Sequence, residues 1–255
     1  MSRPLHLDSL PPVARLASVA LGLARPSAAG DVWRFGVSRL DALALPLAAL
    51  HEVFPDAEGD GPAAAAAVLL LALLAARQGP IVWVRDDAAR RDGRLYGLGL
   101  AELGCNPDRL LLVEAPDVLG VLRAGHDAVA CPAIGAVILA VTGTARALDL
   151  TVTRRFAHAA GRSGVPTLLL RQGEVRPTAA FSRWRVAAAP SQPLAAGAPG
   201  LPSFTFRLDR HRGGAPGFAI NLEWDRDRSV LRTPLPGAAP ALAARRTRRQ
   251  ERRVA

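Results

Sequence analysis

The chain has 255 residues, half of them hydrophobic, and a formal net charge of +10. This composition excludes wholesale disorder and allows one sizeable α/β core with terminal extensions. Two cysteines, Cys105 and Cys131, are too few and too far apart in sequence for a disulfide framework, which predicts a cytoplasmic protein. Prolines interrupt the N-terminal segment, so we expect no export signal. The apolar run 63–76 is shorter than the roughly 20 residues of a membrane span and predicts a buried helix without membrane association.

Apolar periodicity predicts the elements in chain order. Residues 10–24 have the spacing of an amphipathic helix. Apolar runs bounded by turn residues predict buried strands over 48–54, 81–84, 110–113, 136–141 and 167–170. Helices are predicted over 63–76, 117–130 and 150–160. Because strands alternate with helices, we expect an α/β fold with a mostly parallel sheet covered by helices on both faces.

The pattern changes after Arg171. Three extended segments separated by Pro/Gly-rich turns predict an antiparallel extension of the sheet at 183–188, 204–208 and 218–224. In the first of them Arg183 and Arg185 alternate with Trp184, which predicts a core tryptophan and solvent-facing arginines. The predicted organisation is an N-terminal helical segment (1–30), a core (31–233) and a basic, disordered tail (234–255).

All 32 basic residues are arginine, because the sequence contains no lysine. The stretch RRTRRQERRVA at 245–255 is the densest, and a basic segment of this kind suits phosphates or an acidic protein surface. The alternative is a solvated tail without a dedicated partner. The candidate contact residues in the tail are Arg245, Arg246, Arg248, Arg249, Arg252 and Arg253.

The order of these elements resembles the RecA recombinase core, and several segments resemble the ImuA family of RecA-like mutasome proteins. The segments that carry the resemblance are ALHEV, LYGLGLAELG, LTVTRRFAHAA, TLLLRQ, FSRWRVAAAPS and LDRHRGGAPGFAINLEW, spread over roughly residues 33–225. The resemblance implies a RecA-like fold and a non-catalytic accessory role in error-prone translesion synthesis during the SOS response to DNA damage. It also implies three partners: an ImuB-like, inactive relative of the Y-family polymerases, an error-prone replicative-type DNA polymerase subunit, and RecA itself.

The chain departs from RecA-type ATPases at the phosphate-binding loop. That loop needs G-x-x-x-x-G-K-[ST], in which the lysine neutralises phosphate and the hydroxyl holds magnesium. The matching segment, PDAEGDGPAAAA, keeps only Gly59 and Gly61, and its acids Asp56, Glu58 and Asp60 would repel a triphosphate.

The strand at 136–141 stands where the family has its Walker B strand but does not end in an aspartate. Asp87 stands near the position of the catalytic glutamate, and its alternative role is that of an ordinary polar residue at a strand end. We therefore expect a degenerate site without a cofactor, in a pseudo-ATPase that is not an enzyme.

Other chemistry has little support in the sequence. No two of the five histidines have metal-ligand spacing, so we expect no metal site, and His51 is assigned a structural role. Arg207, Arg210 and Arg212 flank the turn DRHRGGAPG; in RecA-type ATPases a basic cluster here reaches a neighbouring protomer's nucleotide. Without a phosphate site, these arginines are candidates for contact with a nucleic-acid backbone or an acidic partner.

Three alternative functions stay open from the sequence. They are an atypical RecA-like ATPase, a cell-division inhibitor of the SulA type, whose RecA-like core also lacks a phosphate loop, and a simple DNA-binding module.

Overall fold

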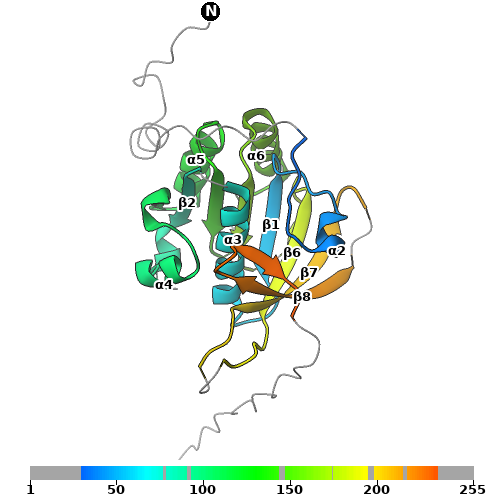
Figure 1. Cartoon of the computed structure of the whole chain (residues 1–255). Coiled ribbons are helices and arrows are strands. Elements are labelled where there is room, and N and C mark those ends of the chain that lie inside the picture. Colours follow the sequence, from blue (N-terminus) through cyan, green and yellow to red (C-terminus); the bar gives the residue numbers. More distant parts are fainter. Residues whose placement is uncertain are drawn as a thin grey trace, which may run out of the picture.

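The computed structural model describes residues 30–76, 79–90, 93–143, 147–173, 175–194, 198–214 and 217–234 (Figure 1). The helix predicted over residues 10–24 lies outside the described residues. So do the basic tail from residue 235 onward and its six candidate arginines.

A nine-stranded sheet forms the centre of the described chain, in the order β3-β2-β4-β5-β1-β6-β7-β8-β9. The first six strands in this order are parallel, and β7, β8 and β9 continue the sheet antiparallel to their neighbours. The strands are β1 (Leu50–Pro55), β2 (Ile81–Asp86), β3 (Leu110–Ala115), β4 (Ala136–Val141), β5 (Thr167–Arg171), β6 (Ser182–Ala188), β7 (Ser203–His211), β8 (Phe218–Asp225) and β9 (Val230–Arg232).

Helices cover both faces of the parallel half. α5 (Val118–Val129) and α6 (Leu150–Ser163) pack on one face, and α3 (Gly61–Ala76) packs on the other against β1, β4, β5 and β6 (Figure 1). The remaining helical segments are short: α2 (Ser38–Asp41), α4 (Gly97–Glu102) and the 3₁₀ turns η2 (Asp87–Arg90) and η3 (Pro107–Arg109). Each face of the sheet therefore has its own hydrophobic core.

Local sequence signals explain where α5 and α6 begin and where α6 ends. Asp117 caps α5 by accepting the amide of Gly120 at 2.7 Å, and Asp149 caps α6 by accepting the amide of Val152 at 2.8 Å. Gly164 ends α6 in the left-handed conformation, with φ of 78°. Most side chains of the apolar helix α3 are buried, and they share one core with residues of β1, β4, β5 and of the C-terminal strands β6 to β9.

The predicted fold class is confirmed: a mostly parallel sheet, helices on both faces and an antiparallel C-terminal extension. β4 has the predicted bounds, and most other elements differ from prediction by one to three residues at an end. The strand predicted from Ala48 begins at Leu50, because the chain still turns at Ala49, whose amide bonds the carbonyl of Leu47 at 2.8 Å. β9 was not predicted.

Candidate functional site

A cavity of about 820 Å³ opens at the carboxyl ends of the parallel strands. In open α/β sheets this edge is where ligands bind. The cavity lies between the loop after β1, the first turns of α3, the segment 93–103 and the ends of β4 and β5. Its apolar wall includes Phe54, Trp83, Leu100, Leu103 and Leu170. The volume suits a drug-sized molecule. The polar part of the lining consists of Asp56, Glu58, Arg85, Arg94, Thr142 and Gln172.

The loop that occupies the phosphate-binding position is closed by its own carboxylate. Asp60 accepts the amide of Ala57 at 3.1 Å and the amide of Ala188, in β6, at 3.2 Å. Gly59 makes the turn with φ of +96°, and Gly61 lines the cavity beside the side chain of Gln172. A phosphate cradle needs loop amides that point at the ligand. Here the amide of Ala57 already donates to the carboxylate of Asp60.

The two other acids of this loop line the cavity. Asp56 forms an ion pair with Arg207 of β7, and Glu58 is exposed. Arg207 is thus turned toward its own chain's loop, a contact that sequence reasoning missed. A signal was present, since the segment around Arg207 is rich in arginine and the loop after β1 is acidic.

Where β2 and β4 end, a buried carboxylate meets a hydroxyl. Thr142 follows β4, and its Oγ1 donates to Oδ1 of Asp86 at 2.7 Å, while Asp86 is only 3 % exposed. Asp87, the acid singled out from the sequence, is exposed in η2 and does not line the cavity. The carboxylate that reaches β4 is therefore that of Asp86. The pair RDD carried this signal, because only one of two consecutive acids can lie on a given face of a strand.

Metal and nucleophile chemistry find little support among the described residues. No group of three or more His, Cys, Asp or Glu side chains in this part of the chain is arranged to hold a metal ion. Burial raises the pKa of the Cys105 thiol, which makes it a poorer nucleophile at neutral pH. Cys131 is buried as well.

His51 has the contacts of a structural residue. Its Nδ1 lies 2.7 Å from Oγ of Ser182, and its Nε2 lies 2.9 Å from the carbonyl of Pro46 and 3.3 Å from the indole Nε1 of Trp33. In one tautomer Nε2 donates to the carbonyl, and in the other it accepts from the indole. Burial lowers the pKa of His51 to about 4, with a smaller contribution from the nearby His211. The ring is therefore neutral at pH 7.

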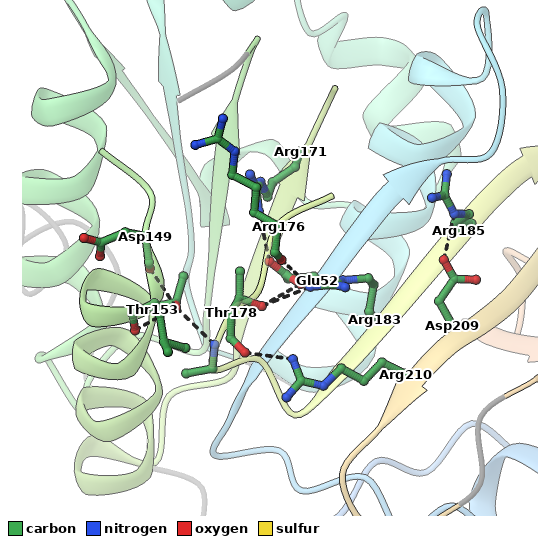
Figure 2. A network of polar contacts seen from close by, with 12 residues as sticks. Glu52, Asp149, Thr153, Arg171, Arg176, Thr178, Arg183, Arg185, Asp209 and Arg210 are labelled. Atoms are coloured by element: carbon green, nitrogen blue, oxygen red, sulfur yellow. Dashed lines mark hydrogen bonds and ion pairs between the residues drawn. The ribbon is translucent and has the colours of Figure 1, made fainter. Parts of the chain in front are cut away.

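A second polar region lies on β1, β5 and β6, around Glu52 (Figure 2). The carboxylate of Glu52 is fully buried and accepts from Arg171 at 3.4 Å, from Nε of Arg183 at 2.9 Å and from the hydroxyl of Thr178 at 2.9 Å. Burial lowers the pKa of Arg171, while Glu52 raises it and Arg183 and Arg176 lower it further.

The prediction that Arg183 faces solvent is wrong. Its side chain is 11 % exposed, because it points at Glu52 on the neighbouring strand. The core position predicted for Trp184 is confirmed, since that residue is 5 % exposed. Sequence reasoning passed over Glu52, although a carboxylate inside an apolar strand requires a buried cation.

The candidate contact arginines of β7 lie close to this region. Arg210 donates to the carbonyl of Thr178 at 2.7 Å, so it joins the Glu52 network through the segment between β5 and β6 (Figure 2). Arg212 is exposed just past β7. The structure therefore brings Arg207 and Arg210 onto one strand, with Arg212 in the turn that follows it.

Within the described part of the chain, no helix is long and apolar enough to cross a membrane.

No protein-family model matches the chain. The curated proteins include Protein ImuA of Caulobacter vibrioides, in strains NA1000/CB15N and ATCC 19089/CB 15. Each is 34 % identical over 189 residues, which cover 68 % of this chain and 74 % of the relative. The crystal structure of the RadB recombinase aligns with a TM-score of 0.52 and 16 % identity, and covers 80 % of this chain and 100 % of that one. The structural likeness shows a RecA-like fold.

Proposed function

Because the chain belongs to the ImuA family, we propose that it is a non-catalytic accessory protein in DNA-damage-induced, error-prone translesion synthesis. It presents a RecA-shaped surface to other proteins of this process and has no ATP-hydrolysing cycle of its own. The proposed partners are an ImuB-like inactive polymerase relative, an error-prone replicative-type polymerase subunit and RecA, all in the cytoplasm.

The closed loop after β1 is the observation that carries the non-catalytic half of the proposal. A triphosphate needs an amide cradle and a lysine at this position. The chain has no lysine, and the carboxylate of Asp60 accepts the amide of Ala57. At the end of β4 the residue is Val141, and the hydroxyl of Thr142 donates to the buried Asp86 of β2. Phosphate binding at the loop would require the loop to open.

Family membership supports the other half. A member without an ATPase cycle can still act through shape, and the RecA-like fold supplies a large, rigid scaffold around its sheet. We expect partner binding to be independent of ATP. Co-purification of the tagged full chain with its ImuB-like partner, with and without ATP and magnesium, tests this. A partner yield that depends on ATP contradicts the proposal.

Equilibrium binding of a fluorescent ATP analogue tests the loss of nucleotide binding. Because most of the cavity wall is apolar, a fluorophore can enter it without phosphate recognition, so the free fluorophore and displacement by unlabelled ATP are necessary controls. We expect no displacement by ATP at millimolar concentration, with or without magnesium. Micromolar, magnesium-dependent binding that unlabelled ATP displaces would overturn the proposal and favour an atypical ATPase.

A further inference from the structure

One face of β6 and β7 carries arginines in place of a covering helix. Trp184, Phe206 and Leu208 point into the core on the α3 side. The alternating residues of these strands point to the opposite face, where α5 and α6 pack against β1 to β5. Arg207 has a side-chain exposure of 46 % and Arg185 of 28 %. This part of the sheet is therefore open to a ligand.

The register of β6 and β7 sets these arginines directly against one another. Arg183 lies opposite Arg210, and Arg185 lies opposite Arg207. Like charges at directly opposed positions destabilise an antiparallel pair. A β-bulge leaves Asp209 without a partner residue on β6, and its carboxylate accepts from Arg185 at 2.7 Å and from Arg207 at 3.4 Å. The bulge thus inserts one negative charge between two pairs of positive charges.

The positive charge of this face exceeds the negative charge it contacts. We define the arginine face as Arg171, Arg183, Arg185, Arg207 and Arg210. The ion pairs of these five arginines in the described structure are with Glu52, Asp56 and Asp209. Glu52 is completely buried and engages Arg171 and Arg183, whose side chains are 4 % and 11 % exposed, whereas Arg207 is 46 % exposed.

Opposed like charges that cost stability are typical of a binding surface. Guanidinium groups match phosphate oxygens in geometry and charge. Half-exposed ion pairs such as Arg207 with Asp56 contribute little to stability, so a phosphate can compete for them. Along β7 and onto β8 the face continues with Thr205 and Asn221, and the hydroxyl of Thr205 donates to Oδ1 of Asn221 at 2.8 Å. The described side chains offer this face cations and polar groups, with no aromatic ring free to stack a base, because Phe54 lies under Arg171 and Arg183.

We propose that the arginine face binds the sugar-phosphate backbone of single-stranded DNA without sequence preference. A duplex is stiff over about 50 nm and would touch an open sheet along one line, whereas a single strand can follow cations spread over β5, β6 and β7. The choice of DNA rests on the proposed function in damage tolerance. The phosphate binding itself follows from the charge and exposure of the face.

Binding of a fluorescein-labelled 20-mer of thymidine, followed by anisotropy at several salt concentrations, tests the proposal. The background is the full-length chain with the six tail arginines of residues 245–255 replaced by glutamine, so that the tail does not mask the face. We expect Arg207→Gln with Arg210→Gln to weaken binding about tenfold and to reduce the salt slope by about 1 to 2.

The matched control is Arg226→Gln with Arg228→Gln, which removes the same charge from the exposed turn between β8 and β9. We expect it to weaken binding less than twofold, and an equal effect of the two double variants overturns the proposal. Thermal unfolding monitors the fold, and Arg207→Gln alone replaces the double variant if Arg210→Gln destabilises the chain.

Competition experiments distinguish single-stranded DNA from two other candidate ligands, an acidic protein and duplex DNA. Polyglutamate and unlabelled single-stranded DNA are added as competitors at equal total charge. If polyglutamate displaces the labelled oligonucleotide as effectively as the unlabelled DNA does, the face is a site for an acidic protein and the proposal is overturned. Duplex DNA that binds as tightly as the single strand overturns the preference for single strands. Neither ATP nor a protein partner takes part in these measurements, so a negative result here leaves the proposed accessory function standing.

Discussion

Arg183 donates its Nε to Oε2 of Glu52 at 2.9 Å across the boundary between β6 and β1, where the register places the two residues opposite each other. Arg171 reaches the other oxygen of the same carboxylate from β5, on the far side of β1. One buried carboxylate therefore ties three adjacent strands together. Because β6 is also the first partner of the antiparallel extension, this contact joins the two halves of the sheet.

The first prediction concerns this carboxylate. Glu52→Gln leaves the buried guanidinium of Arg171 without a counter-charge, so we expect the free energy of unfolding to fall by about 3–5 kcal/mol. Urea unfolding measures the loss. Asp209→Asn is the control, because its partners are partly exposed and its loss costs less than about 1 kcal/mol. Equal losses in the two variants would show that the Glu52 cluster does not hold the strands together.

The second prediction is a dependence of stability on pH. The pKa of His51 is lowered from 6.5 to about 4 by burial, so the unfolded chain takes up a proton in this range while the folded chain does not. Stability is therefore complete above pH 6.5 and is lost as the pH falls toward 4, by about 3 kcal/mol at 1.36 kcal/mol per pKa unit.

Urea unfolding between pH 7 and pH 4.5 measures this dependence for the natural chain and for His51→Asn. Carboxylates titrate in both proteins, and the difference between the two curves isolates His51. We expect the curves to converge as the pH falls. Parallel curves would mean that His51 contributes nothing to the acid sensitivity.

The sequence predicts the parallel half of the sheet well, because β2, β4 and β5 are buried throughout and consist mostly of apolar residues. β4, with every residue buried, has its predicted bounds. Short elements, and elements without a continuous apolar run, are not predicted in this way. β9 has three residues, and α4 begins within the glycine-rich segment GLGLAE, whose composition does not favour a helix.

Some features of the candidate site can likewise be predicted from the sequence, and others cannot. The absence of lysine and the acidic loop can be read from the sequence, and so can the candidate status of Arg207 and Arg210. The Glu52–Arg183 contact joins residues 131 positions apart and depends on which strand lies beside β1. Alternation alone places Arg183 on the face opposite Trp184 but does not say that a buried acid already occupies that face. Only the strand order supplies this information.

The third prediction tests the close approach of two turns. A Cβ at Gly135 would lie 2.8 Å from the backbone of Gly79 and 2.9 Å from the Cβ of Ala76. Because backbone cannot move aside cheaply, we expect Gly135→Ala to lower the free energy of unfolding by about 1–3 kcal/mol. Gly97→Ala is the control, since nothing lies within 4 Å of its Cβ and alanine favours a helix. A neutral Gly135→Ala would mean that the turns before β2 and β4 are not tightly packed.

The fourth prediction compares two buried tryptophans that differ in their hydrogen bonding. The indole Nε1 of Trp83, in the cavity wall, is buried without a hydrogen-bond partner among the described residues, whereas that of Trp184 donates to Oγ of Ser182 at 2.9 Å. Substitution by phenylalanine removes the same atoms at both positions. It removes an unsatisfied donor at position 83 and a made hydrogen bond at position 184.

We therefore expect Trp184→Phe to cost about 1 kcal/mol more than Trp83→Phe in the free energy of unfolding, measured by urea unfolding in the same buffer. A Trp83→Phe variant that loses as much stability as Trp184→Phe would mean that the indole N–H is satisfied in solution, by a water or a ligand in the cavity. Repeating both measurements in the presence of ATP then separates these cases. ATP changes neither value if the cavity has lost nucleotide recognition.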